Sequence, residues 1–544
     1  MPSAIDALAG LLDRRADAGM VGARLVYPDG VLQEAGGIIW RDGSGSNYGN
    51  RDDPRKHQYN YVREVDYCSG AAIMLPRARW DEMGGFDEVF LPAYCEDSDL
   101  AFRLRAAGWK VLYQPRAIVV HHEGVSHGTD TGTGIMAYQV ENTRKLALRW
   151  GETLAREALP NGKQIMRARD RAMGRKITLV IDHYVPEPDR DAGSRTMLAF
   201  MEALVSSGRI VKFMPDNLYR TPEYSDALED LGIEILHGPW TESLAVWISE
   251  NGADVDEVLV SRPDIAAKYL PLLRQHCRAP LVFYGHDLHS ARMRLEPGAL
   301  QDSTRLKEIS RMEDLERNVW RLVDVALYPS EDEAEAVRRM EPRAKVRAIQ
   351  PYALSAPQTH AETAPASSTI IFVGGFRHTP NVDAAIWLAT EILPLIQQER
   401  GNAKLLIVGS NPTQEVLALA GPGIEVRGFV SDEELERLYA EARVALCPLR
   451  IGAGVKLKVV EAMHRGVPVV TTSIGAQGLP ELPTLCDVAD DKNSLATATL
   501  RLLSDDALWL ARVEAQSDYV RLRFSIDAMR LALTTIFDDA TRSR

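Results

Sequence analysis

The sequence has 544 residues, of which 45% are hydrophobic and 26% are charged, and this composition excludes a disordered, collagen-like or purely membrane-embedded chain. Its 63 basic and 76 acidic residues give a net charge of −13. That charge argues against a general nucleic-acid or anionic-membrane surface, but it leaves room for a local basic cleft that binds phosphate. At roughly 150 residues per domain, the length predicts three or four domains.

The cysteine pattern indicates neither a disulfide framework nor a zinc site. The five cysteines are odd in number, widely separated and outside any CxxC spacing: Cys68, Cys95, Cys277, Cys447 and Cys486. The chain also shows no signal-peptide pattern at its start and no run of about 18 uncharged apolar residues. We therefore expect a cytoplasmic protein that is neither secreted by a standard signal nor membrane-spanning.

The first 175 residues show a different pattern of predicted strands, helices and loops from the rest of the chain. Residues 1–150 mix short strands with turn-rich loops and one clear helix, SDLAFRLRAAG, which Gly108 ends. Residues 151–175 are polar and are expected to form a helical linker. We interpret 1–150 as a separate module.

From residue 176 on, continuous apolar strands alternate with amphipathic helices, the pattern of parallel sheets covered on both faces. A tract rich in Ala, Pro, Ser and Thr at 355–368 divides this region into two similar halves. The sequence thus predicts an α/β protein with two doubly wound, Rossmann-like domains at 176–365 and 366–544. Ligands of such folds bind at the carboxyl ends of the strands.

The string GGFDEVFLPAYCEDSDLAFRLRAAG carries carboxylates before and at the start of its helix, at Glu96, Asp97 and Asp99. Such carboxylates cap free amides, which is the simplest reading of Asp99. Asp97 could instead act as a general base on an alcohol. His121 ends an apolar strand, where it is either a surface histidine or a ligand of a divalent metal.

Four strings together resemble the acceptor half of a family 2 glycosyltransferase of the GT-A type: DYCSGAAIM (66–74), GGFDE (84–88), CEDSDL (95–100) and HHEG (121–124). The resemblance implies Asp97 as the base that deprotonates the acceptor hydroxyl and His121 as a ligand of Mg or Mn. The nucleotide-binding half of that family, with its Asp-x-Asp motif, has no counterpart before VGARLVYPDG. We therefore expect an incomplete GT-A-like module that is inactive by itself.

The string PLRIGAGVKLKVVEAMHRGVPVVTT (448–472) places a glycine-containing loop before a helix. Gly452 and Gly454 let the backbone approach a phosphate, which the helix amides then favour. Lys456 and Lys458 add positive charge, and Glu461 can accept hydrogen bonds from ribose hydroxyls. The alternative is an ordinary solvated helix start.

Residues 176 to about 520 resemble a family 4 glycosyltransferase of the GT-B type. The resemblance implies Glu461 on the ribose of the donor, the 452–458 loop on its diphosphate or sugar, and retention at the anomeric carbon. Two departures leave the donor sugar unassigned: Ala453 stands where many relatives have a glutamate, and VGGFRHTPN (373–381), with Gly374, replaces an Arg and Lys pair.

Two loops of the 176–365 half are expected to face the same cleft. Gly193 and Ser194 follow the strand KITLVID and are assigned to donor binding. Asp287 and His289 follow another apolar strand and are assigned to catalysis on the acceptor side, a hydrogen-bonded loop histidine being the alternative. Ser330 ends a further strand and is a weaker candidate.

These patterns predict a glycosyltransferase that moves a sugar from a nucleotide-sugar donor to a glycan or lipid-linked acceptor, with no nucleic-acid partner. We expect it to work in cell-surface polysaccharide biosynthesis, in the cytoplasm, and leave peripheral association with the inner face of the membrane open. The GT-B unit should need no cofactor, because lysines and helix amides neutralise the donor phosphates. The alternative is a catalytically degenerate carbohydrate-binding or scaffolding protein.

Overall fold

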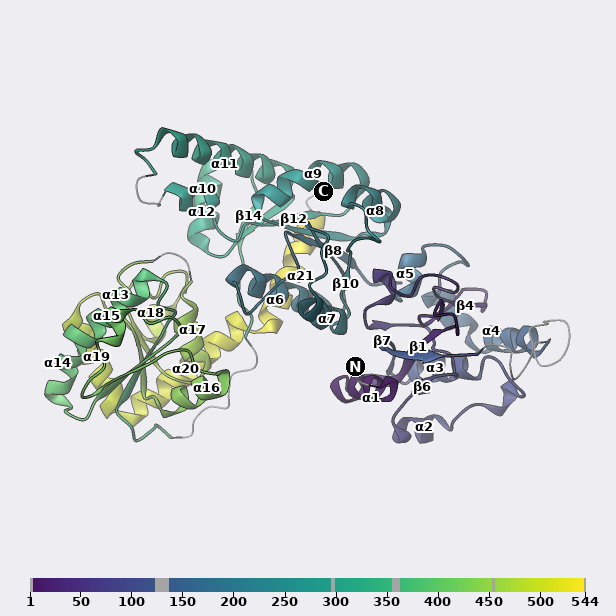
Figure 1. The fold of residues 1–544 in the computed structure, drawn as a ribbon, viewed down its shortest axis with the longest axis horizontal. Helices are drawn as coiled ribbons and strands as arrows, with labels where there is room; N and C mark the ends of the chain where they lie inside the picture. Colours follow the sequence, from purple (N-terminus) through teal and green to yellow (C-terminus); the bar gives the residue numbers. More distant parts are fainter. Residues whose placement is uncertain (1–2, 123–136, 295–298, 355–362, 453–454, 543–544) are drawn as a thin grey trace. The chain divides into compact units, whose positions relative to one another are not determined.

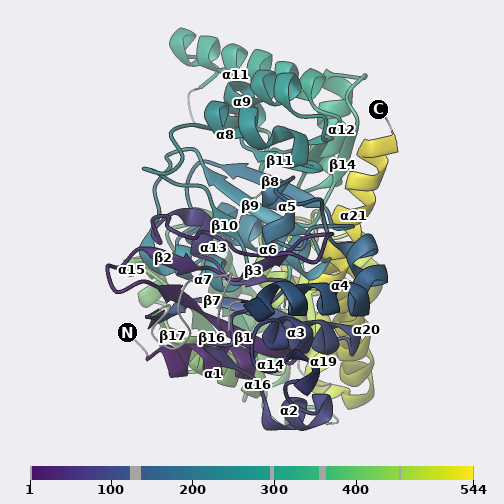
Figure 2. The same ribbon diagram turned by 90° about the vertical axis from the view of Figure 1, so that its right-hand side faces the viewer.

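The computed structural model describes residues 3–122, 137–294, 299–354, 363–452 and 455–542. The chain divides into two compact units, which Figures 1 and 2 show from two sides. The first unit comprises residues 1–284, 298–326 and 536–544, and the second comprises 285–297 and 327–535.

The first unit begins with an α/β module built on a small mixed sheet. Its strands lie in the order β2-β1-β7-β5, β6 also pairs with β1, and β1 and β7 run parallel. The helices α3 and α4 pack together, with Phe102 stacked on Trp150 at 5.1 Å between ring centroids (Figures 1 and 2). The elements are α1 (Ala4–Arg14), β1 (Ala18–Val26), β2 (Leu32–Glu34), β3 (Gly37–Ile39), β4 (Gly45–Asn47), β5 (Arg63–Glu64), β6 (Ile73–Met74), α2 (Arg77–Met83), α3 (Glu96–Ala106), β7 (Lys110–Val120), α4 (Ala137–Glu157) and α5 (Ile165–Arg169).

A seven-stranded sheet follows, in the order β10-β9-β8-β11-β12-β13-β14. The strands from β10 to β12 pair in parallel, and each of them is fully buried, as the continuous apolar runs predict. The elements are β8 (Ile177–Asp182), α6 (Ala192–Ser206), β9 (Ile210–Pro215), α7 (Pro222–Asp230), β10 (Glu234–Ile235), α8 (Leu244–Asn251), β11 (Glu257–Ser261), α9 (Pro263–His276), β12 (Leu281–Tyr284), α10 (His289–Arg294), α11 (Ser303–Leu322), β13 (Val325–Tyr328), α12 (Glu331–Met340) and β14 (Val346–Ala348).

The second unit contains a six-stranded parallel sheet in the order β17-β16-β15-β18-β19-β20. Successive side chains of β15 point to opposite faces, so that Ile370 and Phe372 join one apolar core while Ile371 joins another. Helices α13, α14 and α19 cover the first face, and α16, α17 and α20 cover the second (Figure 1). Parallel sheets covered on both faces confirm the predicted doubly wound α/β class.

The remaining elements all belong to this last part of the chain. They are β15 (Thr369–Val373), α13 (Thr379–Trp387), a π-helical turn (Leu388–Ile392), α14 (Leu393–Glu399), β16 (Lys404–Val408), α15 (Gln414–Leu417), β17 (Ile424–Arg427), α16 (Asp432–Glu441), β18 (Val444–Cys447), α17 (Leu457–His464), β19 (Val469–Thr471), α18 (Leu482–Leu485), β20 (Asp487–Val488), α19 (Lys492–Ser504), α20 (Asp506–Phe524) and α21 (Ile526–Arg542).

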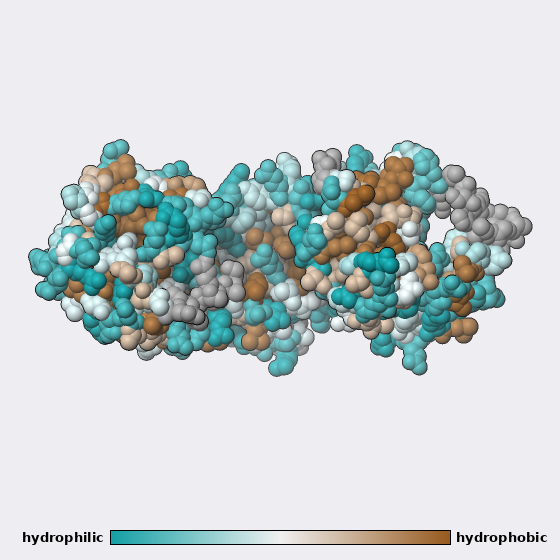
Figure 3. Space-filling view, turned by 90° about the horizontal axis from the view of Figure 1, so that it is seen from below, coloured by the Kyte–Doolittle hydropathy of each residue, from teal (hydrophilic) through white to brown (hydrophobic). Residues whose placement is uncertain are grey.

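The protein surface is mostly polar on the face shown in Figure 3, where hydrophobic residues form separate patches. None of the helices in the described ranges has the length and apolar content needed to cross a membrane.

A buried cluster of charges joins the N-terminal module to the edge of the seven-stranded sheet. Lys212 of β9 has its Nζ 2.5 Å from Asp170 Oδ2 and 2.6 Å from Glu234 Oε2. Arg169 donates to the same Glu234 oxygen at 2.6 Å, and His57 Nδ1 lies 2.7 Å from Glu234 Oε1. All five residues are buried.

The cluster balances the charge of its buried carboxylates. Burial by itself would raise the pKa of Glu234, but the positive charges of Arg169 and Lys212 outweigh burial and hold that pKa well below its ordinary value. Arg169 and Asp170 belong to the segment that we expect to be a linker, so this segment contributes buried contacts to the first unit. The domain boundaries themselves stay predictions.

Replacing Lys212 with Met should lower the free energy of unfolding by about 3–5 kcal/mol, because Asp170 and Glu234 would keep buried negative charges with less compensation. Urea denaturation followed by circular dichroism measures this change. The matched control is Lys268→Met, which removes a 2.6 Å ion pair with Asp216 whose lysine side chain is 55% exposed. We expect a loss of at most about 1 kcal/mol there; equal losses in the two variants would contradict a stabilising role for the cluster.

Candidate functional site

The strongest candidate site lies where β15 and β18 end and α17 begins. Lys456 is the residue before α17, and Lys458 is in the first turn of that helix. The amides of a first helical turn have no partner within the helix, and they carry the positive end of its dipole. Two lysines and these amides therefore concentrate positive charge at one point.

Lys458 is held by neutral groups rather than by a carboxylate. Its ammonium group donates a hydrogen bond to Asn381 Oδ1 and lies 5.5 Å from the ring centroid of Phe372. Asn381 in turn donates through Nδ2 to the carbonyl oxygen of Gly375 at 2.7 Å. An amide oxygen carries no net charge, so this contact orients the lysine without neutralising it.

Burial and neighbouring charge disfavour the protonated forms of the lysines at this site. Burial, with a further contribution from Lys458, lowers the pKa of Lys456 to about 8. Burial likewise lowers the pKa of Lys458. A bound anion would relieve both effects, because it favours the protonated forms.

Glycines allow the backbone and side chains to pack closely in this region. A Cβ atom at Gly374 would lie 3.0 Å from Asn381 Nδ2, and one at Gly409 would lie 2.0 Å from the carbonyl oxygen of Gly374. Gly452 has a φ of +142°, which residues with a side chain rarely adopt. It also lies close to the Lys456 side chain, because a Cβ atom added at Gly452 would be 3.1 Å from Lys456 Cε. Gly454, which we assign to the donor, and Ala453 lie outside the described residues.

Glu461 occupies the next turn of α17, on the helix that carries Lys458. Its side chain is half-buried, and its charge is the second cause, after burial, that raises the pKa of Tyr439. The structure therefore brings Lys456, Lys458 and Glu461 onto one helix start, with Gly374 next to Asn381. Their role in donor binding stays a prediction. Asn381 lies within the string VGGFRHTPN but was not predicted as a site residue. Its position at the start of a helix is the sequence feature that could have suggested it.

Ser194 lies in the first turn of α6, a helix of the first unit that Asp191 caps. Asp191 precedes α6 and accepts hydrogen bonds from the Ser194 amide at 2.8 Å and the Ser194 hydroxyl at 2.6 Å. Gly193 lies in the first turn of the same helix. The Ser194 side chain is thus buried and engaged by its own cap, and the assignment of both residues to the donor stays a prediction.

Asp287 and His289 lie within ion-pair distance of each other. His289 Nε2 lies 3.3 Å from Asp287 Oδ1, while Arg292 Nε lies 3.0 Å from Asp287 Oδ2. The carboxylate therefore holds both a histidine and an arginine at the start of α10. Their catalytic role on an acceptor stays a prediction.

In the N-terminal module, Asp97 lies on α3 beside the loop that contains Gly70. Its Oδ2 accepts from the Gly70 amide at 2.9 Å, and its Oδ1 accepts from the Ser98 amide at 2.6 Å. Burial raises the pKa of Asp97, although these hydrogen bonds oppose the rise. A carboxylate whose pKa is raised is a better base than an ordinary aspartate.

Glu34 is a second carboxyl group at this place, and no sequence pattern pointed to it. Glu34 is 1% exposed, its Oε1 accepts from the Ser69 amide at 2.9 Å, and its buried Oε2 has no hydrogen-bond partner among the described residues. Burial raises its pKa to about 8, and the charge of Asp97 adds to the rise. The adjacent amides of Ser69 and Gly70 thus bind the carboxyl groups of Glu34 and Asp97, respectively. With a pKa of about 8, the Glu34 carboxyl group is mostly neutral at pH 7.

His121 lies one residue beyond β7, with Nδ1 3.0 Å from Gln33 Oε1. Within the described ranges, no three His, Cys, Asp or Glu side chains gather in a way that could hold a metal ion. The described residues thus offer His121 without a set of partner ligands. Its assignment as a ligand stays a prediction.

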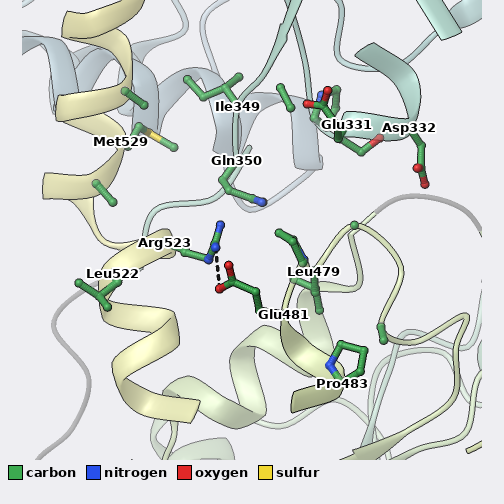
Figure 4. Close-up of a pocket in the computed structure, with 18 of the residues that line it drawn as sticks. Glu331, Asp332, Ile349, Gln350, Leu479, Glu481, Pro483, Leu522, Arg523 and Met529 are labelled. Carbon is green, nitrogen blue, oxygen red and sulfur yellow. Dashed lines mark hydrogen bonds and ion pairs between the residues drawn. The ribbon is translucent and has the colours of Figure 1, made fainter. Parts of the chain in front are cut away.

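A pocket of about 850 Å³ lies in the second unit, and Ser330 lines it. Figure 4 shows Arg523 and Glu481 facing each other at this pocket, with a 2.8 Å ion pair, and Gln350 next to them. Lys456, Lys458 and Glu461 are not part of its lining. The pocket is therefore distinct from the lysine pair.

Comparison with known proteins identifies the segment that carries the lysine pair. Residues 367–505 match the family model described as glycosyl transferases group 1. The glycosyltransferase resemblance of the C-terminal half is thereby confirmed, and the N-terminal resemblance is confirmed by similarity to rhamnosyltransferases.

Among the curated relatives, the N-acetylglucosaminyl-diphospho-decaprenol L-rhamnosyltransferase of Mycobacterium tuberculosis is 32% identical over 148 residues, which are 25% of this chain and 48% of that protein. The O-antigen biosynthesis protein RfbC of Myxococcus xanthus is 30% identical over 136 residues, 24% of this chain and 10% of that protein. The chain thus spans less than half the length of these relatives. Among solved structures, sucrose-phosphate synthase from Thermosynechococcus elongatus aligns with a TM-score of 0.46 at 18% identity, covering 68% of this chain and 100% of that one.

Raising the pH should weaken the binding of a nucleoside diphosphate, because Lys456 loses its proton as the pH rises through about 8. We expect the dissociation constant of the wild-type chain to rise up to about tenfold per pH unit above that value. In Lys456→Met, binding should be weaker at pH 7 and nearly independent of pH. Lys404→Met, at an exposed lysine of β16, is the control. Calorimetric titration measures these constants, and an unaltered pH dependence in Lys456→Met would refute the assignment.

Replacing Glu34 with Gln should change how stability depends on pH. Glu34 has a pKa of about 8 in the folded chain against an ordinary value of 4.5, so between these values the unfolded chain releases a proton that the folded chain keeps. Wild-type stability therefore falls as the pH rises from 4.5 to 8, and Glu34→Gln should remove this fall, about 1.4 kcal/mol per pH unit at most. Thermal unfolding at several pH values measures it, with the exposed Glu88→Gln as the control; parallel curves for Glu34→Gln and wild type would disprove the neutral carboxyl group.

Proposed function

We propose that the chain is a glycosyltransferase that moves a sugar from a nucleotide-sugar donor to a glycan or lipid-linked acceptor in cell-surface polysaccharide biosynthesis. The lysine pair at the start of α17 carries this proposal. Lys456 and Lys458 are partly desolvated, repel each other and lie within the segment that matches group 1 glycosyltransferases. A donor diphosphate is the ligand that this charge arrangement fits.

The same charges serve the reaction itself. When the bond between the sugar and the diphosphate breaks, negative charge develops on the leaving phosphate oxygen. Lys456, Lys458 and the first amides of α17 would stabilise this charge, and they need no reorganisation at that moment. Glu461 would accept hydrogen bonds from the ribose hydroxyls and fix the nucleotide.

Two ligand assignments follow from the relatives and the charges. The M. tuberculosis relative is named for an acceptor with a diphospho-decaprenol anchor, which supports a lipid-linked acceptor and work at the inner face of the membrane for this chain too. The lysines supply the positive charge that a divalent ion gives in other donor sites, so the group 1 unit should bind its donor without metal. The N-terminal module would be the part of the chain that binds Mg or Mn, with His121 as one of the metal ligands.

A carbohydrate-binding scaffold remains the second candidate, because Ala453 replaces a carboxylate that many relatives have. Such a protein would bind nucleotide or glycan without transferring sugar. Release of nucleoside diphosphate from the donor separates the two candidates.

The function is tested by screening nucleotide sugars for thermal stabilisation of the full chain, with EDTA present, and then assaying turnover of those that bind. Glu461→Ala and Lys458→Ala should each weaken donor binding by roughly 10- to 100-fold, because each removes a charge-assisted contact. Lys404→Met serves as the control. Unchanged binding in both variants would remove the site assignment, an absolute need for manganese would overturn the metal-free binding, and tight binding without turnover would favour the scaffold.

A further inference from the structure

We propose that Asp182, His183 and Arg262 form a subsite for the hydroxyl groups of an acceptor sugar at the carboxyl edge of the seven-stranded sheet. All three residues belong to the first unit. The inference rests on the proposed function and adds an acceptor-side site that involves neither Asp287 nor His289.

The sheet topology brings these residues together from positions 80 apart in sequence. Strands β8 and β11 are parallel neighbours, β8 ends at Asp182, and β11 ends one residue before Arg262. The carboxyl ends of neighbouring parallel strands meet at one edge, where ligands of open α/β sheets bind. The loops that follow β8 and β11 therefore lie at the same edge, although β9 and β10 come between these two strands in the sequence.

Asp182 is the positioning residue of the group. Its side chain is 2% exposed, and its Oδ1 accepts from Arg262 Nε at 2.8 Å and from the Ser261 hydroxyl at 3.0 Å. The same oxygen lies 2.9 Å from His183 Nδ1 and accepts from the His183 amide at 2.8 Å. One buried carboxylate thus fixes a guanidinium group and an imidazole side by side.

This arrangement sets the chemistry of His183. A carboxylate accepts hydrogen bonds, so the neutral imidazole carries its proton on Nδ1, and Nε2 keeps a lone pair. The side chain is 28% exposed, in contrast to the buried Asp182. Nε2 is therefore an acceptor of fixed direction, suited to a hydroxyl group that donates.

Arg262 adds donors beside this acceptor. Its backbone has a φ of +66°, a conformation that non-glycine residues rarely adopt, and its amide donates to the Tyr284 carbonyl oxygen at 3.1 Å. The recorded contact with Asp182 uses Nε, and the side chain is 25% exposed. A strained backbone that is tied to a third strand places this guanidinium at the sheet edge.

The surroundings favour a neutral sugar over a phosphate. Asp182 offsets the charge of Arg262, and Asp191 stands nearby, its carboxylate accepting from the Tyr184 hydroxyl at 2.8 Å. The ring of Tyr184 lies 3.5 Å from that of His183, centroid to centroid. The planar polar groups carry little net charge together and match the hydroxyl groups of a sugar. The aromatic ring next to them matches the apolar face of the sugar.

The test is saturation-transfer NMR on the full chain with four probes: the methyl α-glycosides of D-glucose, D-mannose, D-galactose and L-rhamnose. At least one should bind wild type, and His183→Ala and Arg262→Gln should each weaken that binding by about tenfold, the effect of losing one hydrogen bond. Asp182→Asn should weaken that binding too, because the amide oxygen that replaces the carboxylate carries no net charge and holds the Arg262 guanidinium and the His183 imidazole less firmly. Lys268→Gln, at the exposed end of an ion pair on α9, is the matched control.

Thermal stabilisation by nucleoside diphosphates, measured on the same variants, separates this proposal from the proposed function. Nucleotide binding should be unchanged in His183→Ala and Arg262→Gln, which also shows that they fold. Glycoside binding that is undiminished in both variants, or no glycoside binding by wild type, would overturn the subsite. Loss of glycoside binding in a chain that binds no nucleotide would support the subsite and reject the glycosyltransferase.

Discussion

The buried lysine of β9 is the interaction on which the first unit depends. Lys212 has no exposed side-chain surface, and its partners Asp170 and Glu234 come from the segment 151–175 and from β10. Separating the module from the sheet would expose this cluster or leave its charges unpaired, and both are costly. A fragment that begins at residue 176 lacks Arg169 and Asp170, so it would differ from the whole chain in its core as well as in its length. The module and the sheet are best studied together.

Both proposed binding sites use the same physical device, a polar side chain that one partner holds in a fixed direction without using all of its hydrogen-bonding capacity. Lys458 is oriented by the neutral amide of Asn381, which leaves its charge for a phosphate. His183 is oriented by Asp182, which leaves Nε2 for a hydroxyl group. In each case the carboxyl end of a parallel sheet brings the two partners together, because strands that share a direction present their following loops at one edge.

The N-terminal module keeps a paired-carboxyl arrangement that its partial resemblance to a GT-A enzyme does not account for. Glu34 and Asp97 are bound by consecutive amides, those of Ser69 and Gly70. Burial raises the pKa of Glu34 to about 8, and the charge of Asp97 adds to that rise. Burial also raises the pKa of Asp97, so both carboxyl groups of the pair hold their protons more firmly than ordinary carboxyl groups do.

The sequence by itself determined the class of the fold and the helix start that carries the lysine pair, because both depend on local sequence patterns. The apolar run ITLVID becomes β8, and the string GAGVKLK leads into α17, since strand burial and helix starts depend on neighbours within a few residues. Only the tertiary structure decided which strand ends meet. Arg262 reaches Asp182 because β11, not β9 alone, lies beside β8, and Glu34 is buried because β2 lies against β1 near Ser69. Hydrophobic periodicity carries no information about strand order, so contacts across the sheet and their pKa shifts emerge only when the chain is packed.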